Sequence, residues 1–285
     1  MELEELRKKI DGIDSEILKL LNKRMEFALR TRKLKKQVTD KPREDSILHK
    51  VKKQRGLLRP DFSGKIYSEI IDESKRLQDQ NPKLIGFQGE HGAFSEVASI
   101  AYNRLLVPVP CNEFSDVFTG VENGQIDFGI VPVENSLGGA VAQVNDLLVE
   151  TDLRIVGEIK IPIHHCLLTL PETDYREIKV VYSHPQALSQ CRGFIARNKL
   201  ESRPYYDTAG AAMMISNERP TAAAAIASRL CAEIYGLEVL KEDIEDHETN
   251  FTRFVILSRE KNEKEGISVL LFFPLHINQV HFSVC

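Results

Sequence analysis

The sequence predicts a chain of two parts, an all-helical segment followed by an α/β segment. Apolar residues recur at a 3-4 heptad spacing from Leu3 onward, which is typical of a long helix. The residues "NPK" at 81–83 then interrupt the helical pattern. From Lys83 short apolar β-prone runs alternate with helical patterns, as in α/β proteins. The 285 residues are enough for about two domains.

The composition excludes several classes of protein. Hydrophobic residues make up 42% and charged residues 28% of the chain, as in an ordinary globular protein. No apolar run is long enough to span a bilayer, and the start "MELEELRKKID" lacks the apolar region of a signal peptide. The five cysteines are far apart and form no CxxC pair, which argues against a zinc site and a disulfide framework. We therefore expect a cytoplasmic protein with no metal, cofactor or membrane contact.

The net charge of −4 is unevenly distributed. Residues 1–80 carry 21 basic and 15 acidic side chains, whereas the remainder carries 17 and 27. The basic stretch "LRTRKLKKQ" fits a solvated helix face, an anion site or a nucleic-acid contact.

The first helix is expected to run from Leu3 to Val38, about 35 residues, and a helix of that length in so small a segment needs a partner. Its apolar seam contains two polar residues, Arg24 and Thr31, which either specify the register of a coiled coil or form a site between helices. Two further helices are expected at 43–55 and 63–80. In the last one Ser74 lies on the apolar face, with Gln78 one turn further on.

Helix geometry tests whether these residues can form a site. Arg24 and Lys35 share a face about 16 Å apart, and their long side chains leave a gap suited to a small polyanion. Arg7 lies about 25 Å from Arg24 and about 100° round the helix, so it reaches that gap only from a second, antiparallel copy.

Four stretches of residues 1–80 resemble the all-helical chorismate mutases: "LRKKID", "LLNKRMEFALRTRKLK", "DKPRE" and "IIDESKRLQ". The resemblance implies a helical domain over 1–81 that forms an intertwined dimer and rearranges chorismate to prephenate. It also implies the roles of the site residues. Lys35 and Gln78 would contact the breaking ether oxygen. Carboxylates would be held by Arg7, Arg24 and Ser74. Asp40 and Glu44 would lie near the substrate hydroxyl, supported by Arg43.

The α/β segment is expected to form mostly parallel sheets. The predicted strands are 84–87, 128–131, 154–163, 166–170, 179–182, 203–206 and 253–257. Two strands in sequence between Ile155 and Leu170 suggest a crossing between two lobes.

Several motifs place polar groups where strands end. "IGFQGEHGAFSE" has the spacing GxxGxxG, so a dinucleotide site is not expected, but the turn could cradle an anion or simply be tight. In three further motifs, polar residues follow the end of a predicted strand: "GIVPVENSLGGAV", "VVYSHPQALSQC" and "YYDTAGAAMM". Taken singly, these polar residues could merely cap helices. Together they predict a ligand cleft at the carboxyl ends of the strands.

These motifs, with "TNFTRF", resemble the prephenate dehydratase family over residues 83–260. The resemblance implies two α/β lobes, similar to type 2 periplasmic binding proteins, that close on prephenate. Prephenate would lose its ring hydroxyl and carbon dioxide to give phenylpyruvate, in phenylalanine biosynthesis. Thr252 would be the donor to the leaving hydroxyl, and Arg253 would neutralise a carboxylate or pin the loop. The cleft-lining residues would be Asn135, Ser183, Gln190 and Thr208, with Glu134 tuning the site; His184 suits an acid or a loop-shaping role.

Residues 261–285 contain "EGISVLLFFPLH", which resembles the first strand of an ACT regulatory domain, and the phenylalanine motifs of that domain are absent. We expect a truncated remnant there. The expected partners are therefore chorismate, prephenate and a second copy of the chain, in a homodimer or higher homo-oligomer, without nucleic acid.

Three other functions fit parts of the pattern. A LysR-type regulator also joins a basic helical domain to two lobes, but a DNA-reading helix-turn-helix needs short helices. A transport-type binding protein needs an export signal. A mutase fused to a lobe that only senses aromatic ligands would not need Thr252.

Overall fold

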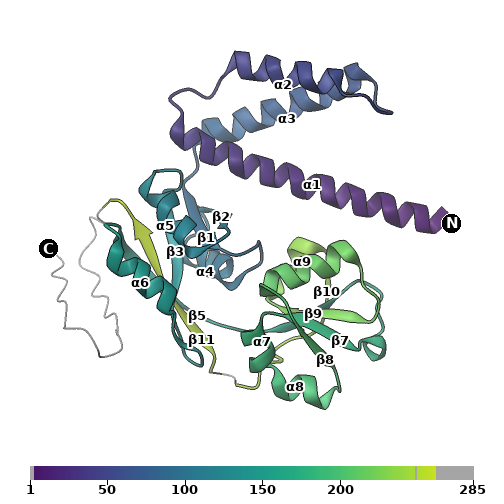
Figure 1. The fold of residues 1–285 in the computed structure, drawn as a ribbon, viewed down its shortest axis with the longest axis vertical. Helices are drawn as coiled ribbons and strands as arrows, with labels where there is room; N and C mark the ends of the chain where they lie inside the picture. Colours follow the sequence, from purple (N-terminus) through teal and green to yellow (C-terminus); the bar gives the residue numbers. More distant parts are fainter. Residues whose placement is uncertain (1–2, 248, 261–285) are drawn as a thin grey trace. The chain divides into compact units, whose positions relative to one another are not determined.

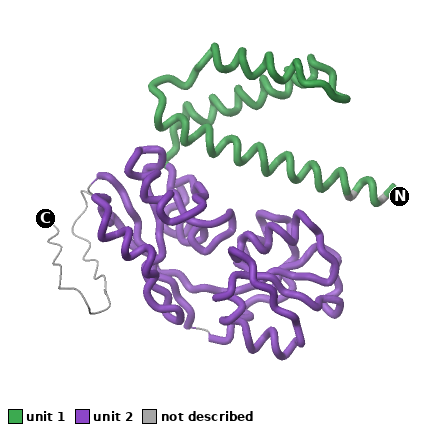
Figure 2. Tube along the Cα trace, viewed as in Figure 1, with its two compact units in different colours: residues 1–83 green, residues 84–285 purple. Residues whose placement is uncertain are grey.

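A computed structural model describes residues 3–247 and 249–260. The chain divides into two compact units between Lys83 and Leu84 (Figures 1 and 2). The region that resembles an ACT strand, 261–285, lies outside the described residues. Among the described residues, no helix combines the length and apolarity that crossing a bilayer requires.

Unit 1 contains three helices, α1 (Leu3–Leu34), α2 (Lys41–Lys53) and α3 (Pro60–Gln80). Helix α3 contacts both others. Near the end of α1, the Lys33 ammonium donates to the Asn81 side chain at 3.2 Å and to the Pro82 carbonyl at 2.8 Å, which ties it to the end of α3. From there α1 and α3 diverge (Figure 1).

Among the described residues, the apolar stripe of α1 is left largely uncovered. Its side chains are 42% to 62% exposed, although their heptad spacing is that of a buried seam. These residues are Leu3, Leu6, Ile10, Ile13, Ile17, Leu20, Phe27 and Leu34.

The three predicted helices are confirmed, with one correction of length. Helix α1 ends at Leu34 instead of Val38, and Arg32 donates to the Lys35 carbonyl at 2.8 Å beyond the helix end. Asp40 then caps α2 by accepting from the Arg43 backbone N–H at 3.2 Å, so these residues form a connection rather than a continued helix.

The first lobe of unit 2 is a six-stranded sheet of order β2-β1-β3-β11-β5, with β4 paired to β3. Its strands are β1 (Leu84–Gln88), β2 (Val107–Cys111), β3 (Phe128–Asn135), β4 (Gly139–Ala140), β5 (Arg154–Pro162) and β11 (Phe251–Ser258). Its helices are α4 (Phe94–Tyr102), α5 (Phe114–Glu122) and α6 (Ala142–Glu150).

The second lobe is a five-stranded sheet of order β10-β6-β9-β7-β8. Its strands are β6 (Cys166–Thr169), β7 (Val180–Ser183), β8 (Glu201–Pro204), β9 (Ala223–Ala227) and β10 (Glu238–Lys241). Its helices are η1 (Tyr175–Glu177), α7 (Pro185–Gln190), α8 (Arg192–Arg197), α9 (Thr208–Glu218) and α10 (Arg229–Tyr235).

The prediction of mostly parallel pairing is wrong for the middle of the first sheet. Strand β11 pairs antiparallel with both β3 and β5, because it returns to this sheet from the second lobe. Antiparallel pairs β6–β9 and β6–β10 occur in the second sheet as well. Both sheets are therefore mixed.

Two segments connect the lobes and run side by side; the sequence predicted the first, between Ile155 and Leu170, but not the second. The Ile163 N–H donates to the Asn250 carbonyl at 2.8 Å, and the Ile244 N–H donates to the His165 carbonyl at 3.1 Å. We call residues 163–165, and residues 243–247 with 249–250, the crossing segments. They join the two lobes at one place in the fold.

A glycine turn of the first lobe packs directly on α10 of the second. A Cβ on Gly92, whose φ is +90°, would lie 2.5 Å from the Cys231 sulfur. The Ser228 hydroxyl donates to the Gly92 carbonyl at 2.5 Å, and the Tyr235 hydroxyl donates to the His91 carbonyl at 2.7 Å. Only glycine combines this backbone conformation with so close an approach.

Candidate active sites

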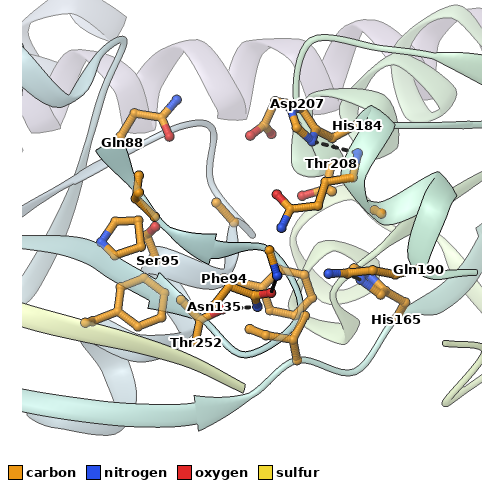
Figure 3. A pocket seen from close by; sticks show the side chains of 18 of the residues that line it. Gln88, Phe94, Ser95, Asn135, His165, His184, Gln190, Asp207, Thr208 and Thr252 are labelled. Atoms are coloured by element: carbon orange, nitrogen blue, oxygen red, sulfur yellow. Dashed lines mark hydrogen bonds between the residues drawn. The ribbon is translucent and has the colours of Figure 1, made fainter. Parts of the chain in front are cut away.

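Unit 2 holds a cavity of about 500 Å³ whose lining comes from both lobes (Figure 3). The first lobe contributes residues of β1, α4, β3 and β11, and the second contributes residues around α7 and α9. The residues among them with polar side chains are Gln88, Ser95, Asn135, His165, His184, Gln186, Gln190, Tyr206, Asp207, Thr208 and Thr252. The predicted cleft residues Asn135, Gln190, Thr208 and Thr252 thus line one cavity.

Asn135 and Thr252 form the wall contributed by the first lobe. They lie opposite each other in the β3–β11 register, and the Asn135 Nδ2 donates to the Thr252 hydroxyl at 2.9 Å. The same Nδ2 lies 2.9 Å from the Asn250 Oδ1, while the Asn135 Oδ1 accepts from the Gly138 N–H at 2.8 Å. These bonds fix the Asn135 amide and leave the hydroxyl proton of Thr252 free to point into the cavity.

Gln190 and His165 form the facing wall, where the His165 Nε2 lies 2.8 Å from the Gln190 Oε1. The imidazole is 2% exposed and presents a T-shaped contact to the Phe94 ring at 5.3 Å. Burial lowers the pKa of His165, so the neutral ring predominates near neutral pH. The sequence motifs did not single out His165.

Asp207 and His184 cap the helices that approach the cavity. Asp207 accepts from the Gly210 N–H at 2.8 Å, and burial raises the pKa of its carboxyl group. The His184 Nδ1 accepts from the Gln186 N–H at 3.2 Å at the start of α7. This contact agrees with the loop-shaping role considered for His184 and leaves the ring at the edge of the cavity.

The glycine turn before α4 is partly filled by the protein's own carboxylate. Glu96 accepts from the Gly92 N–H at 2.6 Å and lies 2.9 Å from the His91 Nδ1. The residues that reach the cavity from the start of this helix are Phe94 and Ser95.

Three other predicted dehydratase residues are not among those that line the cavity. Ser183 is fully buried and donates to the Ile226 carbonyl at 2.5 Å, so it ties β7 to β9. Arg253 pairs with Glu158 of β5, with its Nη2 2.9 Å from the carboxylate. Glu134 is exposed and lies opposite Arg253 in the register. Because strand residues alternate in direction, both side chains lie on the face opposite Asn135 and Thr252.

Two of the mutase residues predicted in unit 1, Ser74 and Gln78, lie in the last turns of α3. Ser74 and Gln78 are 6% and 7% exposed, and the Gln78 Nε2 donates to the Ser74 hydroxyl at 3.1 Å. Among the described residues, the buried Gln78 Oε1 and Arg24 Nη1 have no hydrogen-bond partner. Unpaired buried polar atoms are costly, and they are expected where a polar ligand completes the hydrogen bonds.

Most of the other predicted residues of unit 1 lie at the connection from α1 to α2, and Arg7 lies far along α1. The Lys35 ammonium lies 3.7 Å from the Asp40 carboxylate, and Glu44 pairs with Lys75 at 3.2 Å. The sequence analysis did not identify Lys75, whose ammonium group neutralises the Glu44 carboxylate within the protomer. Arg43 and Arg7 are exposed, and Arg7 lies more than four turns from Arg24 along α1.

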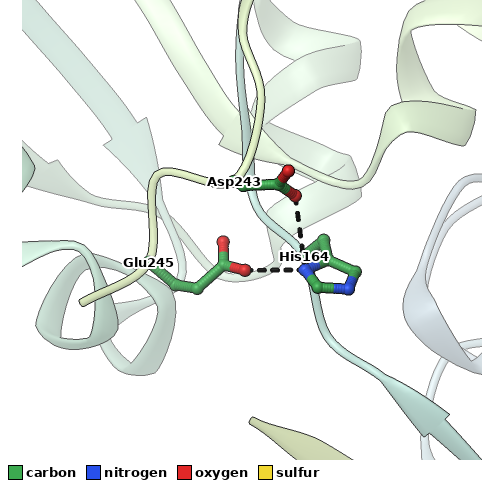
Figure 4. Close-up of side chains that lie close together, drawn as sticks. All are labelled: His164, Asp243 and Glu245. Atoms are coloured by element: carbon green, nitrogen blue, oxygen red, sulfur yellow. Dashed lines mark hydrogen bonds and ion pairs between the residues drawn. The ribbon is translucent and has the colours of Figure 1, made fainter. Parts of the chain in front are cut away.

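One group in the described residues offers metal-ligand atoms: His164, Asp243 and Glu245 of the crossing segments (Figure 4). The His164 Nδ1 lies 2.7 Å from the Glu245 carboxylate and 3.3 Å from that of Asp243. Glu245 also accepts from the His165 N–H at 2.9 Å. Hydrogen bonds within the protein therefore account for this cluster, which joins the two crossing segments.

Comparison with known proteins matches both units. The prephenate dehydratase family model matches residues 85–262, and the chorismate mutase type II model matches residues 6–79. The bifunctional chorismate mutase/prephenate dehydratase of Escherichia coli strain K12 is 34% identical over 277 residues, which cover 90% of this chain and 72% of that protein. The chloroplastic arogenate dehydratase/prephenate dehydratase 2 of Arabidopsis thaliana is 39% identical over 204 residues, 72% of this chain.

The alignment covers 52% of the plant protein, so the chain spans about half the length of that relative. Among solved structures, the prephenate dehydratase of Arthrobacter aurescens in complex with L-Phe is 31% identical, with a TM-score of 0.59 over 65% of this chain and 63% of that one. Since both units match in the same order as in the bacterial enzyme, the chain belongs to the family of bifunctional chorismate mutase/prephenate dehydratases.

Proposed function

We propose that the chain rearranges chorismate to prephenate in unit 1 and converts prephenate to phenylpyruvate in unit 2. The observation that supports the second step best is the buried Thr252 hydroxyl, which accepts from Asn135 and can donate into a cavity lined by both lobes. The loss of carbon dioxide supplies the electron pair that forms the new ring double bond as the C–O bond breaks. The departing hydroxide takes up a proton, which a hydrogen-bond donor at that oxygen assists.

The first step needs neither nucleophile nor proton transfer. It needs a folded dicarboxylate and stabilisation of the negative charge that develops on the ether oxygen. The unpaired Arg24 Nη1 and the second amide hydrogen of Gln78 are available for these contacts. We propose that Arg24 and Ser74 hold carboxylates, and that Lys35 and Gln78 contact the ether oxygen, with Asp40, Arg43 and Glu44 at the hydroxyl side.

We further propose that unit 1 functions as a homodimer. The exposed apolar stripe of α1 has the spacing of a helix seam, and a second copy is the partner that would cover it symmetrically. In an antiparallel pair, the partner's α1 would also bring its own copy of Arg7 toward Arg24. The free, buried cysteines Cys111, Cys166, Cys191 and Cys231 fit a reducing compartment such as the cytoplasm.

Incubation of the purified chain with chorismate, followed by chromatographic identification of the products, tests the proposal. Phenylpyruvate is the expected product, with prephenate as a transient intermediate. Separate incubations with prephenate and with arogenate identify the substrate of unit 2. If chorismate is converted only as far as prephenate, and neither added prephenate nor added arogenate is converted, unit 2 is not the proposed dehydratase.

A further inference from the structure

Two hydrogen bonds on facing walls of the cavity have the same polarity. On one wall the Thr252 hydroxyl oxygen accepts from the Asn135 amide at 2.9 Å. On the other the Gln190 Oε1 lies 2.8 Å from the His165 ring nitrogen (Figure 3). In both Thr252 and Gln190, the side-chain oxygen thus accepts a hydrogen bond from a protein N–H. The groups left to bind a ligand are the Thr252 O–H and the Gln190 N–H donors.

The polarity of the His165–Gln190 pair follows from the chemistry of its atoms. An amide oxygen only accepts, so the Nε2 of His165 must carry the proton. The buried ring is neutral and has a single N–H, which leaves Nδ1 as a bare lone pair; in the described part of the chain Nδ1 has no partner. The reversed pair would place the proton on Nδ1 as a buried, unpaired N–H, and such groups are rare in folded proteins.

The protein holds His165 from several sides, so its ring can orient a neighbour. Its backbone N–H donates to the Glu245 carboxylate at 2.9 Å, and its carbonyl accepts from the Ile244 N–H at 3.1 Å. The Phe94 ring packs against the imidazole at 5.3 Å. The second crossing segment therefore holds the His165 backbone and the first lobe packs on its ring, while Gln190 ends α7 of the second lobe.

We propose that His165 is a positioning residue that holds Gln190 with its amide N–H groups toward the bound substrate. This inference rests on the proposed dehydratase function of unit 2. Prephenate presents carboxylate, carbonyl and hydroxyl oxygens, all of which accept hydrogen bonds. A Gln190 amide turned by 180° would present its oxygen to these groups instead, and two facing acceptors would repel each other.

Two variants separate the donor from the bulk of the ring. In His165→Leu the volume is roughly kept and the donor is lost, whereas His165→Gln supplies an amide N–H near the position of Nε2. We expect kcat/KM for prephenate to fall about 10- to 100-fold in His165→Leu, since misplacement of a substrate-orienting group has effects of this size. His165→Gln should recover most of that loss. Chorismate turnover by unit 1 in the same samples and thermal unfolding serve as controls.

A second measurement does not depend on turnover. Nitrogen-15 chemical shifts of His165 in the folded wild type report which ring nitrogen is protonated, and we expect the Nε2–H tautomer. The Nδ1–H tautomer would overturn the inference, even if the chain did not convert prephenate. With an active wild type, two other results would also overturn it: full activity of folded His165→Leu, or equal losses in the folded Leu and Gln variants. An inactive wild type would count against the proposed function, and the tautomer would still decide the orientation of Gln190.

Discussion

Thr252 and Asn135 face each other across the antiparallel pair of β11 and β3, with the Asn135 amide nitrogen 2.9 Å from the Thr252 hydroxyl oxygen. This contact makes the hydroxyl an acceptor on the protein side and a donor on the cavity side. The pair therefore acts as one group, and the two residues should not contribute independently.

Thr252→Ala should reduce prephenate turnover by about 10²- to 10⁴-fold, because the proposed donor to the leaving hydroxyl is lost. With chorismate as substrate, prephenate should accumulate. Thr252→Ser retains the hydroxyl and is the matched control, so it should keep much more activity than the alanine variant. Product chromatography on both variants checks this prediction, and equal activity of Thr252→Ala and wild type would contradict it.

Gln78→Leu should separate activity from stability in unit 1. We expect mutase turnover to fall by about 10²- to 10³-fold, because a donor to the developing charge is removed. The variant removes the buried Oε1, which has no partner among the described residues, and also the Nε2–H that donates to the buried Ser74 hydroxyl. These two contributions to stability oppose each other, so the melting temperature of unit 1 should change little. Mutase kinetics and thermal unfolding measure the two effects. A lower melting temperature with unchanged mutase activity would show that Gln78 is a structural residue only.

Asp207→Asn should change the pH dependence of stability. Burial raises the pKa of Asp207 in the folded state, so the unfolded chain releases this proton at a lower pH than the folded chain does. The unfavourable contribution of Asp207 therefore appears as the pH rises above the ordinary aspartate pKa, about 4, and is complete above the folded pKa. Asparagine can still accept from the Gly210 N–H but does not titrate. Relative to wild type, the variant should gain stability between pH 4 and neutral pH.

Urea unfolding of both proteins across this pH range tests the sign. A variant whose stability relative to wild type falls as the pH rises would contradict the prediction.

A mixture of two inactive chains should recover mutase activity if Arg7 acts across a dimer. Arg7→Ala and Arg24→Ala each damage every site of their own homodimer. In a mixed dimer, the Arg7→Ala chain keeps Arg24 and its partner keeps Arg7, so one of the two sites is intact. Since half of the dimers are mixed, about one quarter of wild-type activity should return after co-refolding. No recovery in a verified mixed dimer would mean that both arginines act within one protomer.

The elements that the sequence predicted well are those with a strong local pattern. The three helices of unit 1 repeat apolar residues over several turns, and strands such as β1 and β11 are continuous apolar runs. Strands β2 and β9 were missed for local reasons. The first, "VPVPC", contains two prolines and lies at the edge of its sheet, and the second, "AAAIA", is rich in a residue with low β-propensity.

The cavity residues show the same division between local and distant information. The alternation of β3 already separates Asn135 from Glu134, so the outward direction of Glu134 was predictable once the strand continued to Asn135. The pairing of Arg253 with Glu158 depends on the position of β11 beside β5, which no local pattern contains. His165 was missed because it precedes a strand without a recognisable motif, and its contact with the cavity joins it to Gln190, 25 residues away in the sequence.

The central position of β11 also determines the order in which the first lobe can be completed. This strand is synthesised after the whole second lobe, yet it lies between β3 and β5. On the ribosome, β3 and β5 therefore wait with unpaired edges while roughly ninety residues of the other lobe emerge, and such edges favour aggregation. Because β11 also carries Thr252, this late strand brings the cavity-lining hydroxyl with it, and a nascent chain has no complete cavity before both lobes have been made.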